Sequence, residues 1–234
     1  MLESDEARSV RERYLRRDPG HDAARYSPLT PSVYLTDQER ERAIIGFLRS
    51  EIRAPLSGLS VVEIGCGGGR NLLELISLGF APENLHGVEL LESRAEAARR
   101  VLPSSVRIST GDASGIVIPP ASHDIVYQSL VFSSILDSAF RADLARSMWQ
   151  WVRPGGGVLW YDFTYDNPAN PDVRGVKVAE LRGLFPEGVF KIRRVTLAPP
   201  ISRRATRVWP GLYGILNALP LLRTHVLAWI GKPG

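Results

Sequence analysis

Apolar and polar residues follow two different patterns along the chain. From about residue 59 onward, short apolar runs rich in β-branched residues alternate with stretches whose apolar residues recur at helical spacing. Short buried strands that alternate with amphipathic helices are typical of a parallel sheet with helices on both faces. We therefore expect an α/β fold for most of the chain.

Five strands and the helices between them are predicted in order along this region. The expected strands are LSVVEIG (59–65), NLHGVEL (84–90), SVRIST (105–110), one within SHDIVYQSLVF (122–132) and GGGVLWYDF (155–163). Helices are expected over RNLLELISLGF (70–80), LESRAEAARRVL (91–102) and ADLARSMWQWV (142–152).

The last part of the sheet is expected to differ from the rest. A short helix at 178–185 precedes two further strands, at 188–200 and 224–231, without a standard crossover helix between them. This arrangement favours an antiparallel pair at one edge of an otherwise parallel sheet.

The region before the sheet is predicted to be helical and polar. DQERERAIIGFLRSEI indicates a helix near 36–53, and the proline-punctuated YSPLTPSVYLT (26–36) before it should be extended or irregular. We therefore divide the chain into a helical lid segment at 1–55 and a larger domain at 56–234.

Composition narrows the class further. The 234 residues are 44% hydrophobic and 23% charged, which is typical of one ordinary globular domain and excludes disorder as the main state. The single cysteine, Cys66, excludes internal disulfides and thiolate zinc clusters. The charged N-terminus does not resemble a secretory signal, and no run of about 18 apolar residues is present. We expect a cytoplasmic protein.

Charge is unevenly distributed. Residues 171–234 hold 11 Lys and Arg against 3 Asp and Glu, whereas residues 1–170 hold 18 against 22. The local balance of +8 suggests anionic partners such as phosphates, nucleic acid or a membrane surface. Solvated arginines that cover apolar surface with their stems would explain it equally well.

The strongest chemical signal is VVEIGCGGGRNL at 61–72, where a predicted strand leads into a glycine cluster that opens a helix. Glycines let the backbone approach a ligand closely, and the helix start offers free N–H groups. A dinucleotide fingerprint starting at Gly65 would require glycine where Arg70 stands, and no phosphate-loop motif is present. The spacing is instead Gly65-x-Gly67-x-Gly69, with Glu63 two residues earlier.

This string resembles motif I of class I S-adenosylmethionine (SAM)-dependent methyltransferases. Glu89 follows about 20 residues later at the end of the second strand, and Asp112 follows the third strand. WQWVRPGGGVLWYDF resembles the family's helix, its turn and its fifth strand. The resemblance covers about residues 58–165. It implies a Rossmann-like fold, with SAM as the cofactor and S-adenosylhomocysteine as the product.

The resemblance also implies roles for individual residues. Glu63 would neighbour the methionine amine, Glu89 would bind the ribose hydroxyls, and Asp112 would accept a hydrogen bond from the adenine amine. Cys66 would equally serve as a small filler, and Asn71 as a cap of the helix. The expected cofactor contacts are Glu63, Gly65, Cys66, Gly67, Asn71, Glu89, Leu90, Asp112, Ala113 and Gln128.

Acceptor groups are expected at the carboxyl ends of the fourth and fifth strands. Asp162 is the candidate general base and Tyr161 a second catalytic candidate, because a carboxylate that closes an apolar strand requires a partner or a task. A hydrogen bond from Asp162 to a neighbouring loop is the structural alternative. Asp162, Asp166 and Asn167 could instead hold Mg²⁺, but four dispersed histidines give no ligand spacing and we expect no metal.

The acceptor is easier to exclude than to identify. The loop after the fourth strand lacks the proline–proline–aromatic motif of amino-methylating DNA enzymes, and Cys66 lies in the glycine loop rather than where cytosine methylation needs a nucleophile. Nucleic acid is therefore disfavoured. The segments around WYDFTYDNPANPDVRGV and RVTLAPPI are similar to bacterial methyltransferases of polysaccharide gene clusters, which implies O-methylation of a sugar or glycan. A small-molecule methyltransferase of secondary metabolism and a catalytically silent SAM-binding protein are the alternatives.

Two further segments carry expectations about access to the site. Tyr26 and Tyr34 are expected either to close over the cofactor or merely to anchor the following helix. The stretch at about 199–222, with Arg203, Arg204 and Arg207 followed by apolar residues, is an insertion. It could be a short helix docked on the sheet or on a second subunit in a homodimer. It could also be a cap that contacts a lipid-linked acceptor or the membrane surface.

Overall fold

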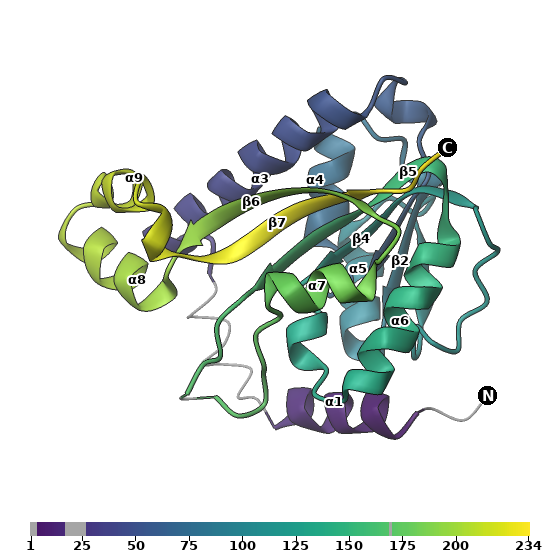
Figure 1. Ribbon diagram of the computed structural model, residues 1–234, viewed down its shortest axis with the longest axis horizontal. Helices are drawn as coiled ribbons and strands as arrows, with labels where there is room; N and C mark the ends of the chain where they lie inside the picture. The colour runs from purple at the N-terminus through teal and green to yellow at the C-terminus, as the bar shows by residue number, and fades with distance from the viewer. Residues whose placement is uncertain (1–3, 17–26, 169) are drawn as a thin grey trace.

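A computed structural model describes residues 4–16, 27–168 and 170–234 of the chain. Its centre is a seven-stranded sheet of order β3-β2-β1-β4-β5-β7-β6 (Figure 1). Strands β1 to β5 pair in parallel, and β7 is antiparallel to both of its neighbours, β5 and β6. The predicted mostly parallel α/β sheet is confirmed. The expected antiparallel pair, β6 and β7, lies at one edge of the sheet.

The strand bounds are close to those expected from the apolar runs. They are β1 Val61–Ile64, β2 Leu85–Glu89, β3 Arg107–Thr110, β4 His123–Ser129, β5 Val152–Phe163, β6 Val189–Leu197 and β7 Arg223–Gly231. Every residue of β1 and β2 is buried, as expected for central parallel strands that are covered on both faces.

Helices cover both faces of the sheet (Figure 1). One face packs against α3 (Pro31–Glu51), α4 (Arg70–Ser77) and α5 (Glu92–Val101), through residues such as Phe47, Leu72 and Ala98. The other face packs against α6 (Ser138–Trp151), α7 (Val178–Leu184) and Val10 of α1 (Asp5–Leu15). Short 3-10 turns lie at Leu56–Gly58, Pro82–Asn84, Phe132–Ser134 and Pro220–Leu222.

The structure corrects the prediction for the segment before the sheet. We expected 26–36 to be extended or irregular, but α3 begins at Pro31. Proline at the first helical position is pre-organised for a helix, because its missing N–H would have no partner within the helix anyway. Thr30 just before it is extended, with φ −81° and ψ 121°, as the residue before a proline prefers.

The stretch at 199–222 does lie between the last two strands, but it is not one helix. It forms α8 (Pro199–Val208) and α9 (Leu212–Asn217), which are separated at Trp209, Pro210 and Gly211. Within the described part of the chain, no helix is both long enough and apolar enough to cross a membrane.

Candidate functional site

The glycine loop between β1 and α4 requires glycine at several positions. Gly65, Gly67 and Gly69 have φ values of 69°, 55° and 84°, a region that side chains with a Cβ rarely adopt. A Cβ on Gly65 would lie 2.5 Å from Val131 Cγ2, whereas a Cβ on Gly67 would meet nothing within 4 Å. The loop is therefore packed at its base and open at Gly67.

Glu89 holds this loop from the carboxyl end of β2. Its two carboxylate oxygens accept hydrogen bonds from the N–H of Gly67 at 2.8 Å and the N–H of Leu91 at 3.0 Å. The side chain is buried. A carboxylate held by two backbone donors is rigid, and each oxygen keeps capacity for a further donor.

Glu63 lies fully buried near the carboxyl end of β1. Oε1 accepts a hydrogen bond from Asn71 Nδ2 at 2.6 Å, whereas Oε2 has no hydrogen-bond partner. Burial raises the pKa of Glu63 to about 8, although Asn71 and the positive charge of Arg40 act in the opposite direction. An unpartnered buried carboxyl oxygen is costly, and it would be satisfied by a cationic donor.

Asp112, after β3, is engaged by the N-terminal helix. Its Oδ2 accepts hydrogen bonds from the Ser4 hydroxyl at 2.7 Å and the Ser4 N–H at 3.3 Å, and its Oδ1 accepts from the Ser114 N–H at 2.9 Å. Ser4 is also the N-cap of α1, where its hydroxyl oxygen accepts from the Ala7 N–H. The start of α1 is thereby tied to the carboxylate expected to bind adenine.

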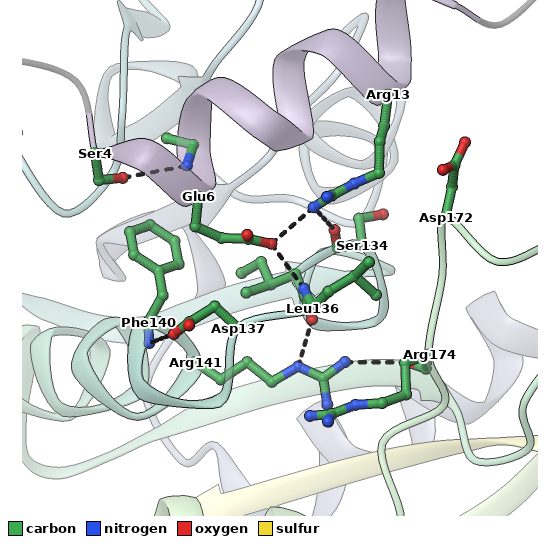
Figure 2. A network of polar contacts seen from close by, with 12 residues as sticks. Ser4, Glu6, Arg13, Ser134, Leu136, Asp137, Phe140, Arg141, Asp172 and Arg174 are labelled. Carbon is green, nitrogen blue, oxygen red and sulfur yellow. Dashed lines mark hydrogen bonds and ion pairs between the residues drawn. The ribbon is translucent and has the colours of Figure 1, made fainter.

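The rest of α1 is tied to the loop after β4 (Figure 2). Glu6 Oε1 accepts from the Leu136 N–H at 2.7 Å and forms an ion pair with Arg13 at 2.7 Å. Arg13 in turn donates to the Ser134 carbonyl oxygen at 3.0 Å, and Tyr14 shares a hydrogen bond with the Ser134 hydroxyl. Helix α1 therefore bridges the loops that follow β3 and β4.

A buried arginine fixes that loop from the other side. Arg141 is fully buried and donates to the carbonyl oxygens of Ile135 at 2.7 Å and Arg174 at 3.1 Å (Figure 2). Its third contact is an ion pair with Glu180 of α7 at 2.7 Å. The loop is thus held between α1 and α6.

The sequence analysis expected a helical lid within residues 1–55 but did not identify α1 in it. The signal was present, because Ser4 followed by Asp5 and Glu6 is a helix start, and Ala7, Val10 and Tyr14 repeat at helical spacing. The residues expected to cover the site were tyrosines. Tyr26 lies outside the described residues, and Tyr34 is half exposed on α3, where its hydroxyl accepts a hydrogen bond from Gln38.

Four other expected cofactor residues occupy packed positions. Gln128 is fully buried, donates to the Tyr161 carbonyl oxygen at 3.3 Å and accepts from the Val131 N–H at 3.1 Å. Cys66 is buried and free, and burial raises the pKa of its thiol. Leu90 and Ala113 are partly buried against the core on the α6 face.

Residues 61–156 match the family model of the methyltransferase domain. These residues carry a methyltransferase domain, as the resemblance to class I SAM-dependent methyltransferases implies. No curated protein matches it, so the finer comparison comes from solved structures.

Solved structures show the same methyltransferase fold across most of the chain. A SAM-dependent methyltransferase from Mesorhizobium loti is 18% identical, with a TM-score of 0.59 over 80% of this chain and 96% of its own. A chain from the complex of the Haloferax volcanii Trm112 methyltransferase activator with its methyltransferase is 14% identical, with a TM-score of 0.61 and full coverage of both. The [4+2]-cyclase SpnF is 13% identical, with a TM-score of 0.61 over 84% of this chain and 82% of its own.

The acceptor side is expected at the ends of β4 and β5, where Asp162 is fully buried. Its Oδ2 accepts from the Ser133 N–H at 3.1 Å and its Oδ1 accepts from the Phe163 N–H at 2.9 Å. Burial raises the pKa of Asp162 to about 7, against the lowering effect of these hydrogen bonds. In this arrangement Asp162 holds the loop after β4. This contact is the alternative role that the sequence analysis gave Asp162 beside that of general base.

Tyr161 lies on the opposite face of the sheet from Asp162, because neighbouring strand residues point to opposite sides. Its hydroxyl is 2.8 Å from the Thr196 hydroxyl, and its ring stacks on His225 with centroids 5.1 Å apart. Burial raises the pKa of Tyr161 to about 12. The structure therefore separates the two catalytic candidates.

Two of the three residues of the alternative Mg²⁺ site are engaged by backbone N–H donors. Asp162 is engaged as above, and Asp166 Oδ1 accepts from the Gly175 N–H at 2.9 Å. Within the residues that the structure describes, no group of three or more His, Cys, Asp or Glu side chains could hold a metal ion.

Proposed function

We propose that this protein transfers a methyl group from SAM to an acceptor hydroxyl, on a sugar or glycan. The observation that carries SAM binding is the unpartnered buried oxygen of Glu63, on the strand that leads into the glycine loop, which is open at Gly67. A donor that carries both a cationic amine and a ribose fits these groups, with Glu89 accepting from the ribose hydroxyls. Asp112 would accept from the adenine amine.

The chemistry of the cofactor is simple, because SAM supplies an electrophilic methyl on a sulfonium. The protein's contribution is to hold its own groups still, which favours an in-line approach of the acceptor. Glu89 fixes the glycine loop, Arg141 and Asp162 fix the loop after β4, and α1 excludes water from the space between them.

The proposal of a hydroxyl acceptor rests on three features: the position of Cys66, the sequence of the loop after β4 and the pKa of Asp162. Cys66 packs against the position of Gly87, where a Cβ would lie 2.7 Å from its sulfur, so it is not placed as a nucleophile for base methylation. The stretch Gln128–Phe132 contains no proline–proline–aromatic motif. A general base with a pKa near neutrality can accept the proton of a hydroxyl as the methyl group is transferred. Burial raises the pKa of Asp162 to about 7, which suits this role.

Two measurements test this proposal in sequence. Calorimetry with SAM should detect stoichiometric binding, and release of S-adenosylhomocysteine should then be followed against sugars, nucleotide sugars and small phenols. Turnover on sugars supports the proposal, and turnover on phenols alone supports the secondary-metabolism alternative. Binding without turnover on every acceptor would favour a silent SAM-binding protein, and absence of SAM binding would contradict all three.

Asp162→Asn is expected to lower turnover while SAM affinity stays nearly unchanged, because the residue lies on the acceptor side. If Asp162 is the base, its charged form is the active one, so wild-type turnover should rise as the pH passes about 7 and then level off. The variant should lose that rise. Turnover against pH, with SAM affinity measured in parallel, checks this.

The matched control is Asp166→Asn, because Asp166 is another carboxylate of the same segment and accepts a backbone N–H from Gly175. It should keep the wild-type pH profile. A lower turnover of Asp162→Asn with an unchanged profile would assign Asp162 to the loop alone, and equal activity at every pH would remove it from the mechanism. Loss of wild-type activity on adding a chelator would revive the Mg²⁺ alternative.

Glu6→Ala is expected to speed the dissociation of SAM, because the variant breaks the contact from α1 to the Leu136 N–H and leaves buried Arg13 without its ion pair. Stopped-flow dissociation of SAM measures this. The control is Glu12→Ala, which removes an exposed carboxylate from the same helix. If both variants release SAM at the wild-type rate, α1 does not cover the cofactor.

A further inference from the structure

The residues 199–222, which we call the lobe, stand away from the body of the molecule beyond the ends of β6 and β7 (Figure 1). The lobe is anchored by Tyr213, whose hydroxyl donates to Glu39 Oε2 of α3 at 2.6 Å. Ser202, Ala205 and Thr206 are buried on the inner side of α8. The lobe therefore has a fixed inner face and an outer face that meets solvent.

The outer face of the lobe is unusually apolar. Leu221 is 90% exposed and Val208 is 82% exposed, and three more large apolar side chains of the lobe are more than half exposed. These three are Trp209, Ile215 and Leu219. Several large apolar side chains exposed within one short segment are typical of a surface that contacts something apolar.

The charge around this apolar surface has a single sign. Residues 188–234 contain eight Lys and Arg and no Asp or Glu. Arg204 and Arg207 are exposed on α8 next to the apolar residues. Positive charge beside exposed tryptophan and aliphatic side chains complements an anionic surface with an apolar interior.

The register of the sheet fixes where the lobe lies relative to the site. Phe163 at the end of β5 pairs with His225, and Leu197 at the end of β6 pairs with Arg223. The chain between Leu197 and Arg223 therefore emerges at the same end of the sheet as the carboxyl end of β5. Glu89, Asp112 and the loop after β4 lie at this same end of the sheet, at the carboxyl ends of the parallel strands.

We propose that the lobe docks the protein on an anionic phospholipid bilayer, with Val208, Trp209 and Leu221 in the interface and Arg204 and Arg207 against the phosphates. Docked in this way, the carboxyl edge of the sheet lies next to the bilayer, so that a lipid-linked acceptor could reach it without leaving the membrane. The docking itself does not depend on methyl transfer.

The test is co-sedimentation of the full chain with vesicles. The wild type should bind vesicles of phosphatidylcholine mixed with phosphatidylglycerol, bind pure phosphatidylcholine much more weakly, and dissociate as NaCl is raised. Arg204→Ser with Arg207→Ser should weaken binding about 30-fold, because each basic residue near an anionic surface contributes about 5-fold. Trp209→Ser with Leu221→Ser should abolish binding.

The matched control is Val189→Ser with Arg100→Ser, which removes one exposed apolar and one exposed basic residue outside the lobe. It should bind vesicles as the wild type does. Calorimetry with SAM on all variants shows that they are folded and keeps this result separate from the proposed reaction. Sedimentation velocity reports any self-association.

Three outcomes would overturn the proposal. The first is a wild type that ignores anionic vesicles at low salt. The second is a lobe variant that binds them as the wild type does. The third is a wild-type dimer that dissociates in Trp209→Ser with Leu221→Ser, which would make the outer face of the lobe a contact between two copies of the chain.

Discussion

Glu89→Ala should weaken SAM binding by about 1–3 kcal/mol, or about 5- to 150-fold. The variant removes the carboxylate proposed to accept from the ribose hydroxyls. It also leaves the N–H groups of Gly67 and Leu91 without their acceptor, so the glycine loop loses its fixed position. Calorimetric titration with SAM measures the change.

The control is Glu92→Ala, which removes the same charge three residues later. Glu92 points outward, where it pairs with Arg99 at 2.7 Å. This variant should bind SAM as the wild type does. If Glu89→Ala and Glu92→Ala bind SAM equally well, the site is not at the end of β2.

Gly67→Leu should remove measurable SAM binding altogether. A Cβ at position 67 meets no protein atom within 4 Å, so the leucine side chain would occupy the open space that the cofactor is proposed to enter. The φ of 55° adds strain of about 1–2 kcal/mol for any residue with a Cβ. Calorimetry measures binding, and thermal unfolding measures the strain.

Strain and obstruction can be separated with Gly79→Leu. Gly79 has φ 107° and open space around its Cβ, but it follows the end of α4, away from the glycine loop. This variant should be destabilised and still bind SAM. Loss of binding in both would mean that instability alone explains the effect, and retained binding in Gly67→Leu would contradict the site.

The sheet could be predicted from the sequence because its signal is local. The runs that contain Val61–Ile64 and Leu85–Glu89 are apolar and bounded by glycine or turn residues, which is enough to identify buried strands. The start of α3 at Pro31 was mispredicted, because proline breaks a helix in its interior but favours its first turn. The pattern of apolar and polar residues alone did not show whether Pro31 lies before the helix or in its first turn.

Only the part of the candidate site that lies within one continuous sequence motif could be predicted from the sequence. Glu63, Gly67 and Glu89 follow from the spacing of a single strand, loop and strand. The contact of Ser4 with Asp112 spans 108 residues of sequence, and no local pattern encodes such a distance. The sequence did not decide whether Asp162 is a general base or a residue that holds a neighbouring loop. The two backbone N–H groups that donate to its carboxylate show how it is held.

The position of β7 has a consequence for how the chain is made. Strand β6 is synthesised before β7, yet β7 lies between β5 and β6 and supplies the ladder for both. Until residues 223–231 have left the ribosome, β5 keeps an open edge and β6 has no place in the sheet. Unpaired strand edges of this kind recruit other chains. A nascent chain paused before residue 223 should therefore depend on chaperones far more than the finished protein does.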